Sequence, residues 1–242
     1  MPVMKIQARH PWNVTPQEAI AIQKALCAEI ITSDALGQVH YVAGIDVGFE
    51  ASNTITRAAI AILSFPELKL VDHVIARLPT QFPYVPGLLS FREVPAVLAA
   101  FEKLNIQPDL LLVDGQGIAH PRRFGIASHI GLLCDIPAIG VAKTRLIGEF
   151  SEVPNKRGAW SPLTYKGEII GAVLRTRTDI NPLYISPGHR ISLQTAIHYV
   201  MACTTKFRLP ETTRWAHRLA SGKESDIQRA LMKNATQKIF LQ

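Results

Sequence analysis

Apolar positions along the 242-residue chain fall into short runs that polar or proline-containing breaks separate. The first helix is expected to begin after Thr15, because Thr15-Pro-Gln-Glu18 has the pattern of a capping box with proline at the first helical position. This helix should continue to about Thr32. Three extended runs follow, at residues 39–49, 57–65 and 68–78. Their short separations predict an antiparallel meander.

The rest of the chain alternates between helical and extended patterns. We expect a helix at 95–104, a strand at 110–113, a helix at 124–134, a strand at 138–142, a long loop at 149–166, strands at 168–175 and 183–185, and helices at 192–204, 211–219 and beyond 225. A meander that leads into strand–helix–strand crossovers implies an α/β fold with one mixed sheet flanked by helices. The length suits a single domain over residues 1–242, with a helical tail at about 221–242.

Composition and charge narrow the functional classes. The net charge of +7 favours a polyanionic partner such as nucleic acid, although a basic protein without such a partner is equally compatible with charge alone. Cys27, Cys134 and Cys203 lie among apolar residues, which favours a reducing compartment over a disulfide frame or zinc site. No apolar run is long enough for a membrane span and no secretory signal is visible, so we expect a cytoplasmic protein. The absence of an obvious dimer stripe favours a monomer.

The run from Asp114 to Gly131 is the strongest candidate for chemistry. It places a carboxylate at the end of an apolar strand and then collects glycines, two histidines and two arginines. An ordinary turn needs only one or two special residues. Open sheets place ligand sites at the ends of such strands, which favours a functional role for Asp114 over a simple Asp-Gly turn.

Two more acids fit a shared site. Asp46 has Gly44 and Gly48 on the same face of its strand, and bare backbone beside a carboxylate suits close approach of a ligand or metal. Glu93 has two possible interpretations. It is either the last position of a Ser90-x-x-Glu93 capping box, or a catalytic group just before a helix that starts at Pro95.

Clustered carboxylates repel one another unless a cation neutralises them. If Asp46, Glu93 and Asp114 meet, their oxygen ligands, with no cysteine, suit Mg²⁺ or its substitute Mn²⁺. On a basic protein, such a site predicts hydrolysis of a phosphodiester.

Four motifs together resemble the endonuclease V (deoxyinosine 3′-endonuclease) family. They are Gly44-Ile-Asp46-Val-Gly-Phe, Pro83-Tyr-Val-Pro-Gly-Leu-Leu-Ser-Phe-Arg-Glu93, Asp114-Gly-x-Gly-x-x-His-Pro-Arg-x-x-Gly-x-Ala-Ser-His and Gly140-Val-Ala-Lys143. The match runs in order from about residue 40 to 220. The resemblance implies a ribonuclease H-like fold and an Mg²⁺-dependent DNA repair enzyme. Such an enzyme would cut the second phosphodiester 3′ of deoxyinosine, leaving 3′-OH and 5′-phosphate ends.

The resemblance also implies roles for single residues. Asp46, Glu93 and Asp114 match the metal-binding carboxylates, and Lys143 matches a basic residue at the catalytic centre. His217 matches a position that is histidine in some members only. The segment Pro83-Tyr84-Val85-Pro86 matches a strand-separating wedge, in which two prolines stiffen the loop and Tyr84 stacks in place of an extruded base.

The remaining predicted contacts surround the substrate. Glycines let backbone approach a flipped base, and His120 with the following Arg122 suits a phosphate. Predicted substrate-binding residues beside the wedge are Gly87, Arg92, Gly115, Gly117, His120, Arg122, Gly125, Gly140 and Ala142. His129 is expected to pack its helix or support a site residue. The stretch 186–190 is expected to be a basic turn, either contacting DNA backbone or simply preceding a helix capped by Ser192.

Two alternatives keep parts of this scheme. The substrate could be inosine-containing RNA, since no residue separates DNA from RNA cleanly. A non-catalytic binder of damaged or branched nucleic acid would also fit the charge. Three intact acids oppose that alternative, because acids repel phosphate unless a metal is bound.

Overall fold

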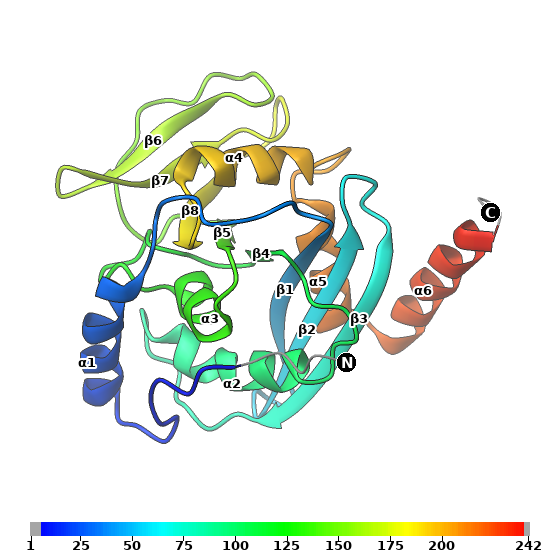
Figure 1. Cartoon of the computed structure of the whole chain (residues 1–242), viewed down its shortest axis with the longest axis horizontal. Helices are drawn as coiled ribbons and strands as arrows, with labels where there is room; N and C mark the ends of the chain where they lie inside the picture. The colour runs from blue at the N-terminus through cyan, green and yellow to red at the C-terminus, as the bar shows by residue number, and fades with distance from the viewer. Residues whose placement is uncertain (1–5, 240–242) are drawn as a thin grey trace.

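The computed structural model describes residues 6–239 of the chain (Figure 1). Its helices and strands, in chain order, are α1 Pro16–Leu26, the 3₁₀ helix η1 Cys27–Glu29, β1 Tyr41–Glu50, β2 Ile55–Ser64, β3 Leu70–Pro79, α2 Leu89–Phe101, β4 Leu110–Val113, α3 Ile126–Cys134, β5 Ala138–Ala142, β6 Trp160–Tyr165, β7 Glu168–Leu174, β8 Leu183–His189, α4 Leu193–Ala202, α5 Glu211–Ser221 and α6 Glu224–Ile239. Thr15 caps α1 through the predicted capping box.

All strands form one mixed sheet in the order β3-β2-β1-β4-β5-β8-β7-β6. β1, β2 and β3 form the predicted antiparallel meander, and β1, β4 and β5 run parallel to one another. Ile45 of β1 lies opposite Val113, the last residue of β4. β1 therefore continues for several residues beyond the end of its neighbour, and the carboxyl ends of the parallel strands meet at this edge.

Helices cover both faces of the sheet (Figure 1). Because strand side chains alternate, Ala43 and Ile45 pack on one face with apolar residues of α2 and α3. Val42 packs on the other face with residues of α4, α5 and α6. α6 lies beside the edge strand β3, where the side chain of Asn234 donates a hydrogen bond to the carbonyl of Leu70.

The glycines around Asp46 have a different cause from the one expected. A Cβ at Gly44 would lie 2.0 Å from the carbonyl oxygen of Thr212, and one at Gly48 would lie 2.5 Å from that of Ala220. The space above the strand is therefore filled by the backbone of α5, not left open for a ligand. The glycines let this helix approach β1, and the helix brings its own side chains to Asp46.

Three expected elements also differ from the structure. Pro95 lies inside α2, which already begins at Leu89, so Glu93 is a helical residue and Ser90 does not cap the helix. The expected loop at 149–166 contains β6, which pairs with β7. The expected basic turn at 186–190 is mostly strand, because β8 continues to His189 and pairs with β5. In each case pairing or packing with distant residues outweighs a local turn signal.

The structure also bears on the cysteines and on membranes. Cys27, Cys134 and Cys203 are all free thiols. Burial raises the pKa of both Cys134 and Cys203 to about 12, which leaves these thiols unreactive. Within residues 6–239, no helix combines the length and apolar character needed to cross a membrane.

Candidate active site

Asp114 and Lys143 directly follow the parallel strands β4 and β5 at the same edge of the sheet. The backbone N–H of Asp114 donates to the carbonyl of Ile45 at 2.9 Å, which continues the pairing with β1 for one more residue. The Lys143 ammonium donates to the Asp114 carboxylate. The topology thus brings together an acid and a base that are 29 positions apart.

Asp46 and His217 form the second pair of the site. Asp46 projects from β1 toward α5, and His217 Nδ1 lies 2.7 Å from Asp46 Oδ2. Asp46 is 8% exposed. Ligand atoms of Asp46, Asp114 and His217 all lie within 4.8 Å of one another, which suits one cation. Among residues 6–239, the third member of this group is His217. The sequence interpretation had instead named Glu93 as the third metal ligand.

Glu93 approaches from α2 and is buried. Burial, together with the negative charges of Asp46 and Asp114, raises the pKa of its carboxyl group to about 8. Burial and the charge of Asp114 likewise raise the pKa of Asp46, against the lowering effects of His217 and Lys143. Three acids that oppose one another's ionisation are a donor set that a divalent cation fits.

A cavity of about 500 Å³ adjoins the acids. This volume falls in the range of small-molecule sites. Its lining comprises Gln23, Tyr84, Val85, Pro86, Gly87, Leu89, Ser90, Asp114, Gly115, Gln116, His120, Gly125, Ile126, Ala142, Lys143, Thr144, Arg145 and Leu146. Most of the predicted substrate residues thus gather around one space beside Asp114, and we call it the base pocket.

The wedge loop, residues 83–87, forms one side of the base pocket. Tyr84 at its tip is 72% exposed, and Pro83 and Pro86 are exposed as well. Tyr84 is an unusually open aromatic side chain, free to meet a large partner. At the base of the loop, Gly87 has φ +78°, a value that favours glycine.

Three side-chain donors converge on the carbonyl of Gly87. They come from Gln23 at 3.1 Å, His120 at 3.0 Å and Arg122 at 2.7 Å. Gln23 belongs to α1, and the other two follow Asp114 in the chain. The end of the wedge loop is therefore fixed to two distant segments, which holds the wedge in one position relative to the base pocket.

His120 is bound within the protein on both ring nitrogens. Its Nε2–H donates to the Gly87 carbonyl, so its Nδ1 accepts the backbone N–H of Arg122 at 3.2 Å. Burial, together with the charge of Arg122, lowers the pKa of His120 to about 4. A neutral, buried imidazole is a poor phosphate ligand, so the structure supports a role in holding the wedge loop instead of the expected phosphate contact.

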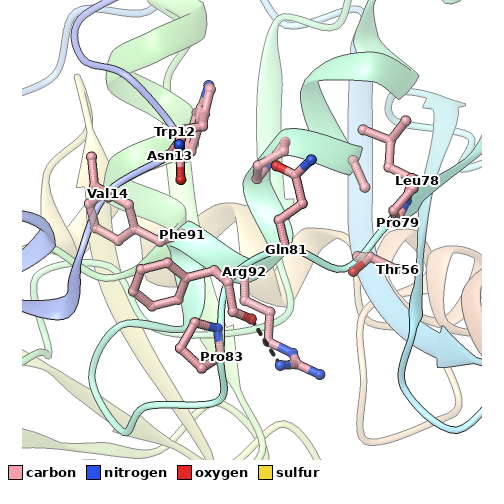
Figure 2. Close-up of a pocket in the computed structure, with 13 residues that line it drawn as sticks. Trp12, Asn13, Val14, Thr56, Leu78, Pro79, Gln81, Pro83, Phe91 and Arg92 are labelled. Atoms are coloured by element: carbon pink, nitrogen blue, oxygen red, sulfur yellow. Dashed lines mark hydrogen bonds between the residues drawn. The ribbon is translucent and has the colours of Figure 1, made fainter.

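Arg92 does not line the base pocket. It lines a smaller cavity of about 160 Å³ together with Pro83 and Phe91 (Figure 2). Its guanidinium donates to the carbonyl of Phe82 at 3.0 Å and lies 4.7 Å from the centre of the Phe49 ring. Arg92 thus holds the start of the wedge loop, and its contact with substrate stays a prediction.

The glycines of the pocket are needed first by the protein itself. A Cβ at Gly117 would lie 2.0 Å from the carbonyl oxygen of Pro187, and one at Gly140 would lie 2.3 Å from the backbone nitrogen of Gly117. A Cβ at Gly125 would meet the carbonyl oxygen of Gln116 at 2.3 Å. These residues pack backbone against backbone, and of the three only Gly125 lines the base pocket. Direct contact of any of them with a base remains a prediction.

Some residues of the site escaped the sequence interpretation. Gln23 is buried on α1 together with Ala19 and Leu26, so a polar residue on the buried face of a predicted helix was the available signal. Gln116 lines the pocket and donates to the Thr144 carbonyl at 3.0 Å. Ser90 was interpreted as a possible cap, but its side chain instead bonds to His129 at 3.0 Å.

Known proteins match this chain over most of its length. The sequence model of the family described as Endonuclease V matches residues 24–218. An endonuclease V of Trichormus variabilis is 59% identical over 221 residues, covering 91% of this chain and 100% of that protein. One of Rippkaea orientalis is 60% identical over 224 residues, covering 93% and 98%.

Solved structures agree with the sequence relatives. Endonuclease V of Streptomyces avermitilis has a TM-score of 0.82 at 37% identity and covers 96% of this chain and 99% of its own. A Ciona intestinalis endonuclease V, bound to DNA containing an inosine followed by a ribo-adenosine, has a TM-score of 0.74 at 28% identity and covers 90% and 100%. Aquifex aeolicus Argonaute, at a TM-score of 0.50 and 15% identity over 77% of this chain and 29% of its own, shares the fold alone. The sheet is ribonuclease H-like, as expected. The chain belongs to the endonuclease V family.

Proposed function

We propose that this protein is a DNA repair endonuclease that recognises deoxyinosine and hydrolyses the second phosphodiester bond 3′ to it, in a reaction that depends on Mg²⁺. The observation that carries the proposal is the position of the acids: Asp114 lines a cavity large enough for a purine, Asp46 shares a possible cation site with it, and the charges of both act on Glu93. The DNA that accompanies the Ciona relative contains inosine, which supports the choice of base.

The metal would be held by Asp46 and Asp114, with Glu93 and His217 at the same place. Once bound, it would activate a water molecule and stabilise the oxygen that leaves the cut bond. Mg²⁺ suits the carboxylate oxygens, and Mn²⁺ would also accept the imidazole nitrogen of His217.

The protein's own side chains would position the strand. Lys143, beside Asp114, would hold the phosphate to be cut through its ammonium group. Tyr84 would stack against the bases that remain after the damaged base enters the base pocket. Pocket shape and main-chain groups of the glycine-rich wall would select hypoxanthine, and the +7 net charge would attract the DNA backbone.

The test is cleavage of an end-labelled duplex with one deoxyinosine, in Mg²⁺ and in EDTA. We expect one nick at the second phosphodiester 3′ of the inosine in Mg²⁺ alone. Asp46→Ala and Asp114→Ala should abolish the nick while binding persists. Full activity in either variant would contradict the proposal.

A matched RNA strand with one inosine separates the two nucleic acids. Faster cleavage of the RNA would assign the protein to inosine-containing RNA. Tight binding without cleavage of either strand would make it a binding protein only.

A further inference from the structure

A chain of hydrogen bonds connects the base pocket to the N-terminal segment. Ser90 lines the pocket from the first turn of α2, and its Oγ lies 3.0 Å from His129 Nδ1. His129 Nε2 lies 2.7 Å from His10 Nε2, and His10 Nδ1 lies 2.8 Å from the carbonyl oxygen of Pro11. Neither histidine belongs to the acid cluster.

The direction of this chain is set at its far end. A carbonyl oxygen only accepts, so His10 Nδ1 carries the proton that it donates to Pro11. When Nδ1 holds the one proton of the His10 ring, Nε2 accepts from His129 Nε2–H. Burial keeps His129 neutral by lowering its pKa, so its Nδ1 carries no proton and accepts from Ser90. The hydroxyl proton of Ser90 is therefore committed to His129.

A serine whose proton is committed can only accept further hydrogen bonds. Hypoxanthine and adenine differ at N1, which carries a hydrogen in hypoxanthine and a lone pair in adenine. We propose that Ser90 is a specificity-determining residue whose Oγ accepts the N1–H of hypoxanthine in the base pocket, with His129 and His10 acting as positioning residues. With adenine in the pocket, the lone pair on N1 would instead face a lone pair of Ser90 Oγ, which is unfavourable. A site built around one polar contact rejects an analogue that lacks it.

The surroundings of the two histidines favour this role over simple packing. Trp12, Phe91 and Phe124 enclose His129, which has no exposed surface. A phenylalanine would fill such a site without polar cost. A buried imidazole that makes two hydrogen bonds instead fixes where one proton lies, and here that proton belongs to a residue of the pocket.

The inference rests on the proposed function, and its test separates the two. Single-turnover cleavage is compared for deoxyinosine and 2′-deoxynebularine, a purine without the 6-oxygen and without hydrogen on N1. Ser90→Ala should slow cleavage at deoxyinosine about tenfold, the loss of one hydrogen bond, and leave the slower cleavage at nebularine unchanged. Ser128→Ala is the control. Ser128 precedes His129 in the chain, and its buried hydroxyl makes no hydrogen bond in the described structure.

His10 supplies a second, distant test. His10→Gln keeps an acceptor for His129 and should preserve the preference for deoxyinosine over nebularine. His10→Leu removes the acceptor, frees His129 to donate toward Ser90, and should reduce the preference about tenfold. Equal slowing of both substrates in Ser90→Ala, or an unchanged preference in His10→Leu, would overturn the inference.

The same oligonucleotides are also compared by equilibrium binding in EDTA, with thermal denaturation to show that each variant folds. A lack of cleavage by the unaltered protein would contradict the proposed function alone. The binding preference would then decide the inference about Ser90. Loss of that preference in Ser90→Ala supports the inference, and an unchanged preference overturns it.

Discussion

His217 Nδ1 lies 2.7 Å from Asp46 Oδ2, although the two residues are 171 positions apart in the chain. The contact depends on the close approach of α5 to β1. His217 is therefore placed either to bind the same cation as Asp46 or to orient that carboxylate. We expect His217→Ala to reduce cleavage by 10- to 100-fold and to shift the Mg²⁺ titration to higher concentrations.

The control for this prediction is Arg214→Ala on the same helix. Arg214 pairs with Glu211 and lies over the Phe207 ring, so its contacts do not involve Asp46. It should leave the Mg²⁺ titration in place. An identical titration for His217→Ala and the unaltered protein would remove His217 from the metal site.

Glu93→Gln should stabilise the metal-free protein while abolishing cleavage. The folded-state pKa of Glu93 is raised to about 8, so ionisation of this carboxyl opposes folding increasingly as the pH rises from about 4.5 to 8. Removing the charge should add on the order of 4 kcal/mol at pH 7.5 in EDTA, measured by denaturant unfolding. Glu102→Gln, at an exposed position, should change little. A less stable Glu93→Gln protein would contradict the raised pKa.

Tyr84→Ala should impair cleavage of duplex DNA more than cleavage of single strands. Base pairing has to be broken only in the duplex, and stacking on an aromatic ring contributes about 1–3 kcal/mol per base. We expect a 10- to 100-fold loss on the duplex and a much smaller loss on single strands. Tyr84→Phe keeps the ring and should retain activity. Equal losses on both substrates would argue against the wedge.

Acidification should destabilise the protein through His120. Its folded-state pKa is depressed to about 4, so between pH 6.5 and 4 the unfolded chain takes up a proton that the folded protein refuses. The full effect is on the order of 3 kcal/mol. Unfolding measured across this range should be less dependent on pH in His120→Gln, whose amide can still donate to Gly87. His198→Gln, at an exposed histidine, should retain the original slope.

Gly44→Ala should be severely destabilising. The added methyl group would lie 2.0 Å from the backbone oxygen of Thr212, so α5 would have to move away from β1. We expect a loss of about 3 kcal/mol or more and weaker Mg²⁺ binding, because His217 moves with the helix. Gly37→Ala, with nothing within 4 Å of the new Cβ, is the control. Similar stabilities for the two variants would refute the close packing.

The antiparallel meander and the mixed sheet could be predicted from the sequence, and so could the meeting of Asp46 with Asp114 if their strands are neighbours, as they are. Both follow from apolar periodicity and from the rule that parallel strands end at one edge. The helical position of Glu93 could not, because the proline two residues later imitates a helix start.

The glycines also show what the sequence alone could not predict. A glycine in a strand indicates close approach, but the pattern alone does not say whether a ligand or the protein's own backbone approaches. At Gly44 it is α5, and at Gly117 it is β8. The three donors on the Gly87 carbonyl come from segments up to 64 positions away in sequence, beyond the reach of any local pattern.

The distribution of site residues along the chain has a consequence for synthesis in the cell. The wedge loop is held by Gln23 near one end, and Asp46 is completed by His217 near the other. A ribosome-bound chain that ends before α5 has all three acids but lacks both His217, the partner of Asp46, and the helix that covers Asp46. Such a nascent chain should be unable to nick DNA until α5 has been synthesised.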